Sequence, residues 1–451
     1  MSEAGHWFPS LENEGGGAHP WARSLGDLLG KLTEILQKYA EEQDSSMKLQ
    51  GKLAAGALAL MAALGLPSGA GARHHVSEGR TVVSTERHEI TAHEAGKPHI
   101  EQRQQAPQDS TPPYSRDFGV PKPWEVEQRD EGGTLLFSDS PEYVTEDGIL
   151  YQDVVEGDAR ILYYHLNNMS SPRKVAVVLE DAAGSKLTVV RITRGGTAAP
   201  STDYLKVGKA TQMAYFGKQK EDTVLLVNGR KRLLQDSMNK VLLQPGELVY
   251  GVYDFHADHP VRVSVIMYPA SRNPYAFLEQ AKVLPKDEVM LRGTFKGMNR
   301  VIYSRKAYDA SKDGIVYVDL GDDNHDKYKE GIDATDGSKA LNYGNYGILY
   351  KLALPTQGPA ATQYYLSPLG GVYAGAMSVR RDHSISTRLL ETPAGCPFFG
   401  DGSQSLSTSW SDRVELADLG SYDNSVPTFF EFSPPGASNL PVQLIMMPAG
   451  N

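Results

Sequence analysis

Short apolar runs alternate with turn residues through most of the chain. From about Leu135 onward, runs such as GILYQDVV, KVAVVLE, ELVYGVYDF and VRVSVIMYP are rich in Val, Ile, Leu and Tyr, and Gly, Pro, Asn and Asp separate them. Turn-bounded runs of this length are typical of antiparallel β-sandwiches. Helical patterns are few, and the best is PYAFLEQAKVL near Phe277. We therefore predict an all-β fold with a helical connector over residues 273–286.

Three patterns recur in the same order in the two halves of this β-rich part. The sequence GILY begins at Gly148 and again at Gly347, a run with two adjacent tyrosines follows each, and the halves close on HPVRVSVIMYPA and LPVQLIMMPA. Ordered internal similarity indicates a repeated structural unit. We predict two tandem antiparallel β-sandwich modules, Ig-like or jelly-roll-like, over residues 135–272 and 287–451.

A secretory signal is predicted over residues 47–72. The segment has a basic start and an apolar run shorter than the roughly 20 residues that a membrane span needs. Ala70 and Ala72 supply the small side chains that a signal peptidase accepts, which predicts cleavage before Arg73. A retained membrane anchor and an Ala-rich core helix are the alternatives. Cleavage predicts a secreted or envelope-associated protein, and no membrane span is expected after it.

Polar segments flank this signal on both sides. Residues 1–46 are interpreted as a spurious or disordered leader, with Met47 as the true first residue. Residues 73–134 are rich in Gln, Glu and His and are interrupted by Pro, so a disordered or extended linker is expected there. The formal net charge of -10 argues against a nucleic-acid partner, because such a partner requires a basic face. The single cysteine, Cys396, forms no internal disulfide and is interpreted as a small buried apolar residue.

The stretch DLGDDNHDKYKEGIDATDG has the oxygen-ligand spacing of a calcium loop. Counted from Asp322, side chains with oxygen ligands occupy the first, third, fifth, ninth and twelfth positions. This spacing lets several carboxylates face one hard cation. Lys327 occupies the position where such loops use Gly, and a plain solvated acidic loop is the alternative. The candidate calcium ligands are Asp322, Asn324, Asp326, Glu330 and Asp333.

Signals for catalysis are weak. His256 and His259 lie in a segment that a turn between strands explains, and the Ser-x-x-Lys patterns at Ser171 and Ser237 lack a companion motif. A carboxylate pair for glycoside hydrolysis has no fixed spacing, so the sequence does not locate one. Tyrosines concentrate on the predicted strands, where they suit sugar binding and are also favoured by β-structure in general.

The stretch GIDATDGSKALNYGNYGILYKLALP, followed by YYLSPLGGVYAGAM, resembles secreted bacterial proteins labelled copper amine oxidase-like or copper amine oxidase N-terminal-domain proteins. The resemblance implies association with the cell envelope. Oxidases of that name make a quinone from the tyrosine of Thr-x-x-Asn-Tyr-Asp/Glu, beside copper held by three histidines, two of them in His-x-His. Here Gly344 follows Asn342-Tyr343, Lys339 replaces the threonine, and His-x-His does not occur. No catalytic residue is therefore carried over.

These observations predict an exported, non-catalytic binding or structural protein of the cell envelope or extracellular space. One alternative is a carbohydrate-binding or adhesin-like surface protein, with cell-wall or extracellular glycan as its partner. The other is a secreted hydrolase whose acidic pair the sequence does not reveal. Calcium is the one cofactor that the motifs suggest.

Overall fold

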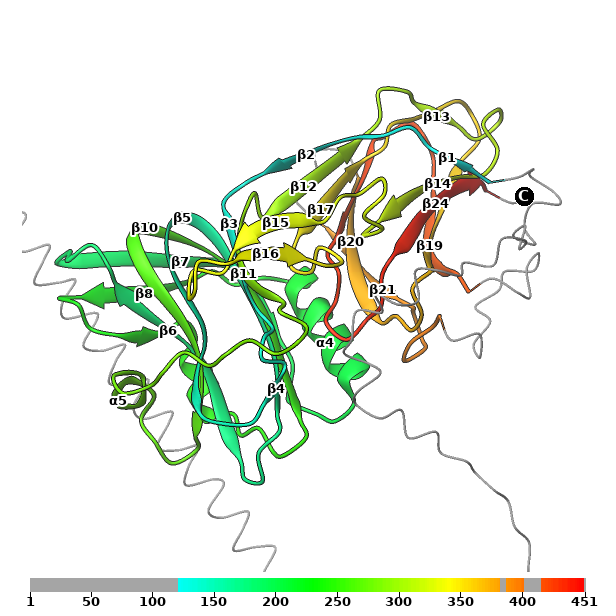
Figure 1. Ribbon diagram of the computed structural model, residues 1–451. Helices are drawn as coiled ribbons and strands as arrows, with labels where there is room; N and C mark the ends of the chain where they lie inside the picture. The colour runs from blue at the N-terminus through cyan, green and yellow to red at the C-terminus, as the bar shows by residue number, and fades with distance from the viewer. Residues whose placement is uncertain (1–120, 382–386, 401–414, 450–451) are drawn as a thin grey trace, which may run out of the picture. The chain divides into compact units, whose positions relative to one another are not determined.

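The computed structural model describes residues 121–381, 387–400 and 415–449 (Figure 1). The fold is mostly β-structure in several sheets, as predicted, and α4 (Tyr204–Phe216) and α5 (Pro274–Leu278) are the α-helices among these residues. Neither helix is long and apolar enough to cross a membrane. The predicted leader, the signal peptide with Ala70, Ala72 and Arg73, and the linker up to residue 120 lie outside the described residues.

Two very long strands form the centre of the larger sheet. β5 (Gly148–Asn167) pairs antiparallel with β10 (Leu248–Pro269) along nearly its whole length. The first half of β10 also pairs with β7 (Leu187–Thr197), and its second half pairs with β6 (Arg173–Asp181). Most residues of both long strands are buried, because apolar clusters pack on both of their faces.

The larger sheet has eleven strands, in the order β16-β15-β11-β3-β5-β10-β6-β9, with β4, β7 and β8 attached beside this path. A short 3-10 helix, Asp236–Lys240, precedes β10. The remaining strands of this sheet are β3 (Thr134–Ser138), β4 (Tyr143–Val144), β8 (Asp222–Val227), β9 (Arg232–Leu233), β11 (Arg292–Lys296), β15 (Lys329–Ile332) and β16 (Lys339–Asn342).

The other strands form a β-sandwich. Tyr364 of one sheet packs against Phe430 of the other, with ring centroids 4.9 Å apart, and one apolar core contains residues from both sheets. The five-stranded sheet is β1 (Lys122–Pro123), β14 (Val316–Leu320), β24 (Val442–Pro448), β19 (Thr362–Pro368) and β22 (Ala417–Tyr422). The six-stranded sheet is β2 (Glu127–Glu131), β12 (Asn299–Tyr303), β17 (Leu349–Ala353), β23 (Thr428–Phe432), β20 (Gly375–Arg381) and β21 (Arg388–Thr392), and β13 (Tyr308–Asp309) pairs separately with β18 (Thr356–Gln357).

The sheets cross the boundaries predicted between linker and modules. β11, β15 and β16 fall within the predicted second module, 287–451, yet they extend the larger sheet by pairing with β3. β1 and β2 fall within the predicted linker, 73–134, yet they pair with β14 and β12 of the sandwich. An edge strand pairs with whichever segment the fold brings beside it. The alternation of apolar residues along the strand does not identify that segment.

The repeated sequence patterns occupy different topologies. GILY at Gly148 begins β5, and the tyrosine pair Tyr163-Tyr164 lies in the same strand. In the second half, GILY leads into β17 of one sheet, whereas the tyrosine pair lies in β19 of the other. The segment HPVRVSVIMYPA pairs with the start of β5, but LPVQLIMMPA pairs with the strand that holds the tyrosines. The similarity of the halves therefore reflects strand composition and does not extend to one shared pairing scheme.

Helix α4 connects the larger sheet to the sandwich. Asp203 caps its N-terminus, and the helix lies against β7 and β10 on one side and β20 on the other (Figure 1). At Gly208 a Cβ atom would lie 2.1 Å from the carbonyl oxygen of Gly436, so only glycine permits this close approach. The predicted connector over 273–286 is helical only within α5. Its later part runs extended, and Val283 forms a parallel bridge with Ile149.

Arg160 of β5 is fully buried and pairs with Asp254 of β10. Its Nε and Nη2 atoms donate to the two carboxylate oxygens at 2.6 and 2.8 Å. The Tyr215 hydroxyl of α4 donates to the same carboxylate at 3.0 Å. The pair is therefore bidentate and bridges two strands and the helix.

The same guanidinium group also reaches the sandwich. Its Nη1 donates to the carbonyl oxygens of Met298 at 2.6 Å and Gly347 at 3.0 Å, and its Nη2 donates to Asn299 Oδ1 at 3.1 Å. Met298 directly precedes β12 and Gly347 lies two residues before β17, and these are neighbouring strands of the six-stranded sheet. One buried cation thus holds the larger sheet, α4 and the sandwich in register.

Replacing Arg160 with Met is expected to lower the free energy of unfolding by about 3–5 kcal/mol, because Asp254 is left as an unpaired buried charge. Urea unfolding followed by tryptophan fluorescence measures this loss. The exposed pair Arg305–Glu127 provides the control, and Arg305→Met should change the free energy of unfolding far less, because solvent screens an exposed ion pair. Equal losses in the two variants would contradict the role assigned to Arg160.

Candidate functional site

A groove opens where the first described segment crosses from one sheet of the sandwich to the other. β1 is the edge strand of the five-stranded sheet and β2 is the edge strand of the six-stranded sheet. The residues between them close that edge and line a cavity of about 410 Å³, which we call the Trp124 groove. Its lining comprises Pro123, Trp124, Glu125, Val126, Gln128, Ile302, Tyr317, Val318, Asp319, His325 and Asp326.

Trp124 anchors this segment. Its backbone N–H donates to the carbonyl oxygen of Tyr317 at 2.8 Å, and its ring meets that of Tyr308 edge to face, with centroids 5.7 Å apart. The Lys306 ammonium lies 4.5 Å from the indole centroid, a cation–π contact. Trp124 lines the groove and is held by these contacts, with 8% of its surface exposed.

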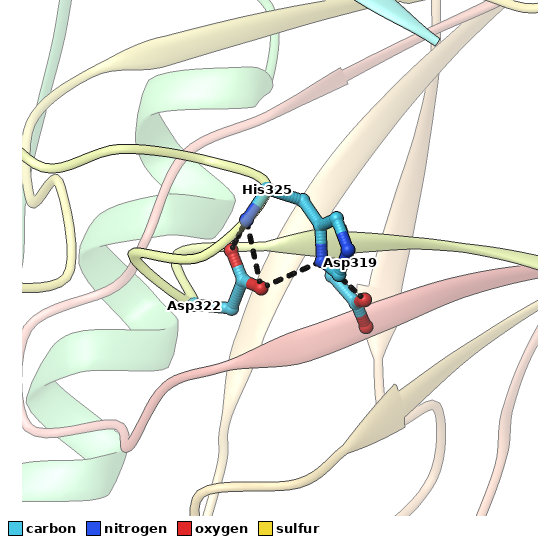
Figure 2. A group of neighbouring side chains, drawn as sticks. All are labelled: Asp319, Asp322 and His325. Atoms are coloured by element: carbon cyan, nitrogen blue, oxygen red, sulfur yellow. Dashed lines mark hydrogen bonds and ion pairs between the residues drawn. The ribbon is translucent and has the colours of Figure 1, made fainter. Parts of the chain in front are cut away.

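Asp319, Asp322 and His325 gather on one side of this groove, within a single stretch of chain. Asp319 lies near the end of strand β14, and Asp322 and His325 lie in the loop that follows. Figure 2 shows the imidazole of His325 between the two carboxylates, with Nδ1 3.0 Å from Asp322 Oδ2 and 3.3 Å from Asp319 Oδ2. The His325 side chain is 69% exposed, whereas the two carboxylates are largely covered.

The two carboxylates have opposite pKa shifts. Burial raises the pKa of Asp319, and the negative charge of Asp322 adds to this effect, although Gln443 donates to Asp319 Oδ1 at 2.9 Å. Burial acts in the same direction on Asp322, but the backbone N–H groups of Asp326 and His325 and the His325 ring favour the carboxylate, so the pKa of Asp322 is lowered. Asp322 is therefore held as an anion beside a carboxyl group that gains protons more readily.

Asp319, Asp322 and His325 together offer the ligand atoms of a divalent-cation site. Its ligand atoms, one imidazole nitrogen and two carboxylate oxygens, all lie within 4.8 Å of one another. Such a mixed nitrogen and oxygen set suits zinc and similar ions, which accept three protein ligands and one water. Asp319, Asp322 and His325 are the residues in the described part of the chain that could hold such an ion at the groove.

The five residues predicted as calcium ligands do not form one cluster in the described residues. Asp326 is buried and accepts hydrogen bonds from Arg300, from the Gly321 N–H at 2.6 Å and from the Tyr350 hydroxyl at 2.5 Å. Asp333 is also buried and pairs with Arg292 at 2.9 Å. Arginine side chains thus neutralise both carboxylates, which sequence spacing alone does not show.

The other predicted ligands point to different surroundings. Asn324 is exposed in the loop, and Glu330 is exposed on β15. Asp322 is the one predicted residue that joins the group at the groove, and sequence reasoning missed its partners Asp319 and His325. Both lie inside the acidic stretch already quoted, so a search that included histidine would have found them. Tyr317 and Trp124 gave no such signal, because the fold alone brings the segment of Trp124 to β14.

A serine–histidine pair is present elsewhere, at Ser138 and His165. The ring Nδ1 lies 2.9 Å from the carbonyl oxygen of Pro141, which only accepts, so Nδ1 carries the proton and Nε2 accepts from Ser138 Oγ at 2.8 Å. This is the tautomer that a general base needs. Both side chains are completely buried, however, so the pair joins β3 to β5 and has no access to a substrate.

Comparisons with known proteins add little. No protein-family model and no curated protein matches the chain. Among solved structures, the crystal structure of vicilin from Solanum lycopersicum (tomato) is similar at 10% sequence identity, over 70% of this chain and 85% of that chain, with a TM-score of 0.09. A similarity at this level carries no argument about function.

The buried ring of His165 predicts a loss of stability in acid. Burial lowers its pKa to about 4, from 6.5 for an exposed imidazole. Between these values the unfolded chain binds a proton that the folded chain does not, so stability is complete above pH 6.5 and falls toward pH 4 by up to about 1.4 kcal/mol per pH unit. His165→Gln, measured by urea unfolding over this range, should lose that slope. Parallel curves for the two proteins would contradict the prediction.

The variant Asp326→Asn tests whether the Asp326 carboxylate binds a cation or pairs with Arg300. We expect the variant to lose about 3 kcal/mol of unfolding free energy, because it leaves Arg300 without its buried partner. The loss should be the same in excess calcium and in a chelator, as measured by urea unfolding. A loss that disappears when calcium is removed would restore Asp326 as a calcium ligand.

Proposed function

We propose that this protein is an exported, non-catalytic binding protein of the cell envelope or extracellular space, and that the Trp124 groove holds its ligand. The groove carries this proposal, because it combines a volume typical of small-molecule sites with converging polar groups on a rigid sandwich edge. Export is supported by the signal-like segment 47–72. The resemblance to envelope-associated copper amine oxidase-like proteins supports the same location.

Carbohydrate is the ligand class that best fits the lining. The phenol of Tyr317 offers an aromatic ring, and the side chains of Gln128, Asp319, His325 and Glu125 offer hydrogen-bond donors and acceptors. Sugar recognition uses this combination, in which a ring packs on the apolar face of the sugar and polar groups bind its hydroxyls. Cell-wall or extracellular glycan is accordingly the proposed partner.

The structure gives binding more support than hydrolysis. Asp326 lines the groove, but its carboxylate is engaged by Arg300 and Tyr350. The His325 loop is fastened to β2 through Gln128, whose Nε2 donates to the His325 carbonyl oxygen at 3.3 Å. Asp319 has the raised pKa that a catalytic acid uses, so product release remains a required measurement.

The test is a glycan array with the full chain, followed by titration calorimetry on each sugar that binds. Asp319→Asn and Tyr317→Ala should each weaken binding at least tenfold, because they remove a hydrogen-bond acceptor and the stacking ring. Asp158→Asn is the matched control, since Asp158 is an exposed carboxylate that contacts His256 at 2.7 Å on the larger sheet. This control should bind as the wild type does.

Three results would overturn the proposal. If no glycan binds, or if the control loses affinity as much as the groove variants do, the groove is not a sugar site. If reducing sugar accumulates in the presence of a bound glycan, the protein is a hydrolase instead. Chromatography of the glycan after incubation with the protein provides this second measurement.

A further inference from the structure

Two carboxylates are enclosed in the turn between β3 and β4 without complete pairing. Glu142 is 3% exposed, and its Oε1 atom has no hydrogen-bond partner among the described residues. Asp139, three residues earlier in the same turn, is half-buried, and its Oδ1 atom is also buried without a hydrogen-bond partner among the described residues. A buried carboxylate ordinarily pairs with a cation or accepts several hydrogen bonds, because its desolvation is otherwise very costly.

Hydrogen bonds from neighbouring segments fix the backbone of this turn. Asp287 accepts hydrogen bonds from the Ser140 hydroxyl at 2.8 Å and from the Glu142 backbone N–H at 2.7 Å. The ring of His165 donates to the Pro141 carbonyl oxygen, and the Leu166 N–H donates to the Glu142 carbonyl oxygen at 2.8 Å. Asp287 therefore positions the turn and adds a third negative charge beside it.

A separate residue from β5 faces the same surroundings. The hydroxyl of Tyr164 is buried, 4% exposed as a residue, and has no hydrogen-bond partner among the described residues. Burial raises its pKa first, and the charges of Glu142 and Asp139 raise it further, so both carboxylates act on this hydroxyl. The charged groups that act on the two carboxylates are other carboxylates, with Asp287 acting on both.

We propose that Asp139 and Glu142, with the Tyr164 hydroxyl as an additional oxygen, bind a divalent cation that prefers oxygen ligands, namely calcium. Calcium accepts carboxylate and neutral oxygens in irregular geometry, whereas magnesium requires a near-ideal octahedron. Zinc is disfavoured because both nitrogens of His165, the neighbouring imidazole, are already engaged by Ser138 and Pro141. The ion would lock the β3–β4 turn, a role that does not depend on the Trp124 groove or on any glycan.

The test uses the full chain after treatment with a chelator. Thermal unfolding at pH 7.5, with CaCl₂ added up to about 1 mM, should show a rise in Tm of several degrees. Titration calorimetry on the wild type should show calcium binding and at least tenfold weaker magnesium binding. Neither measurement includes a sugar, so its outcome is separate from that of the glycan array.

Isosteric variants identify the ligands. Glu142→Gln and Asp139→Asn should abolish the calcium-dependent rise in Tm, while each chelated variant should be at least as stable as the chelated wild type, because one buried charge is removed. Asp158→Asn, which removes an exposed carboxylate of the larger sheet, is the matched control and should keep the full response. The proposal fails if calcium leaves the wild-type Tm unchanged and calorimetry shows no binding, which would indicate that the two carboxyl groups share a proton. It also fails if magnesium binds as tightly as calcium, or if Asp158→Asn loses the response and Glu142→Gln keeps it.

Discussion

The buried guanidinium of Arg160 is the constraint on which the arrangement of this protein depends. It satisfies the Asp254 carboxylate, two backbone carbonyl oxygens at the starts of neighbouring sandwich strands, and the amide oxygen of Asn299. These acceptors come from three segments of the chain, at Asp254, at Met298 and Asn299, and at Gly347. A desolvated charge with this many partners tolerates few alternative geometries, and it therefore favours one alignment of the sheets.

The groove lies at one edge of the sandwich. β1 and β2 form the edges of two sheets that face each other, so the short connection between them must span the sandwich. The Trp124 ring fills the space beneath this connection and contacts Tyr308 and Lys306. Polar side chains of β14 and its following loop are then left beside a fixed aromatic wall. A binding site on such a scaffold needs little reorganisation when it takes a ligand.

Buried charges recur throughout this fold, and most of them follow one rule. Asp326 pairs with Arg300, and Asp333, directly after β15, pairs with Arg292 of the neighbouring strand β11. The β3–β4 turn departs from this rule, because its carboxylates are enclosed beside a third carboxylate, Asp287. A site that departs from the local pattern of charge pairing is where a bound ion has a physical reason to be.

The sequence by itself determined the strands, the turns and the predominantly β class, because alternating burial and turn residues are properties of neighbouring positions. It placed Asp322 in an acidic loop but assigned Asp326 and Asp333 to a cation, since their arginine partners carry no local signal. It also divided the chain at 272–287, whereas β11, β15 and β16 cross that division to join β3. Strand partners, buried ion pairs and the groove were decided only by tertiary structure. The reason is that edge hydrogen bonds and desolvated charges are satisfied by whichever segment folds beside them. Gln128 of β2, for example, donates to the carbonyl oxygen of His325 in the loop after β14, which is distant in sequence.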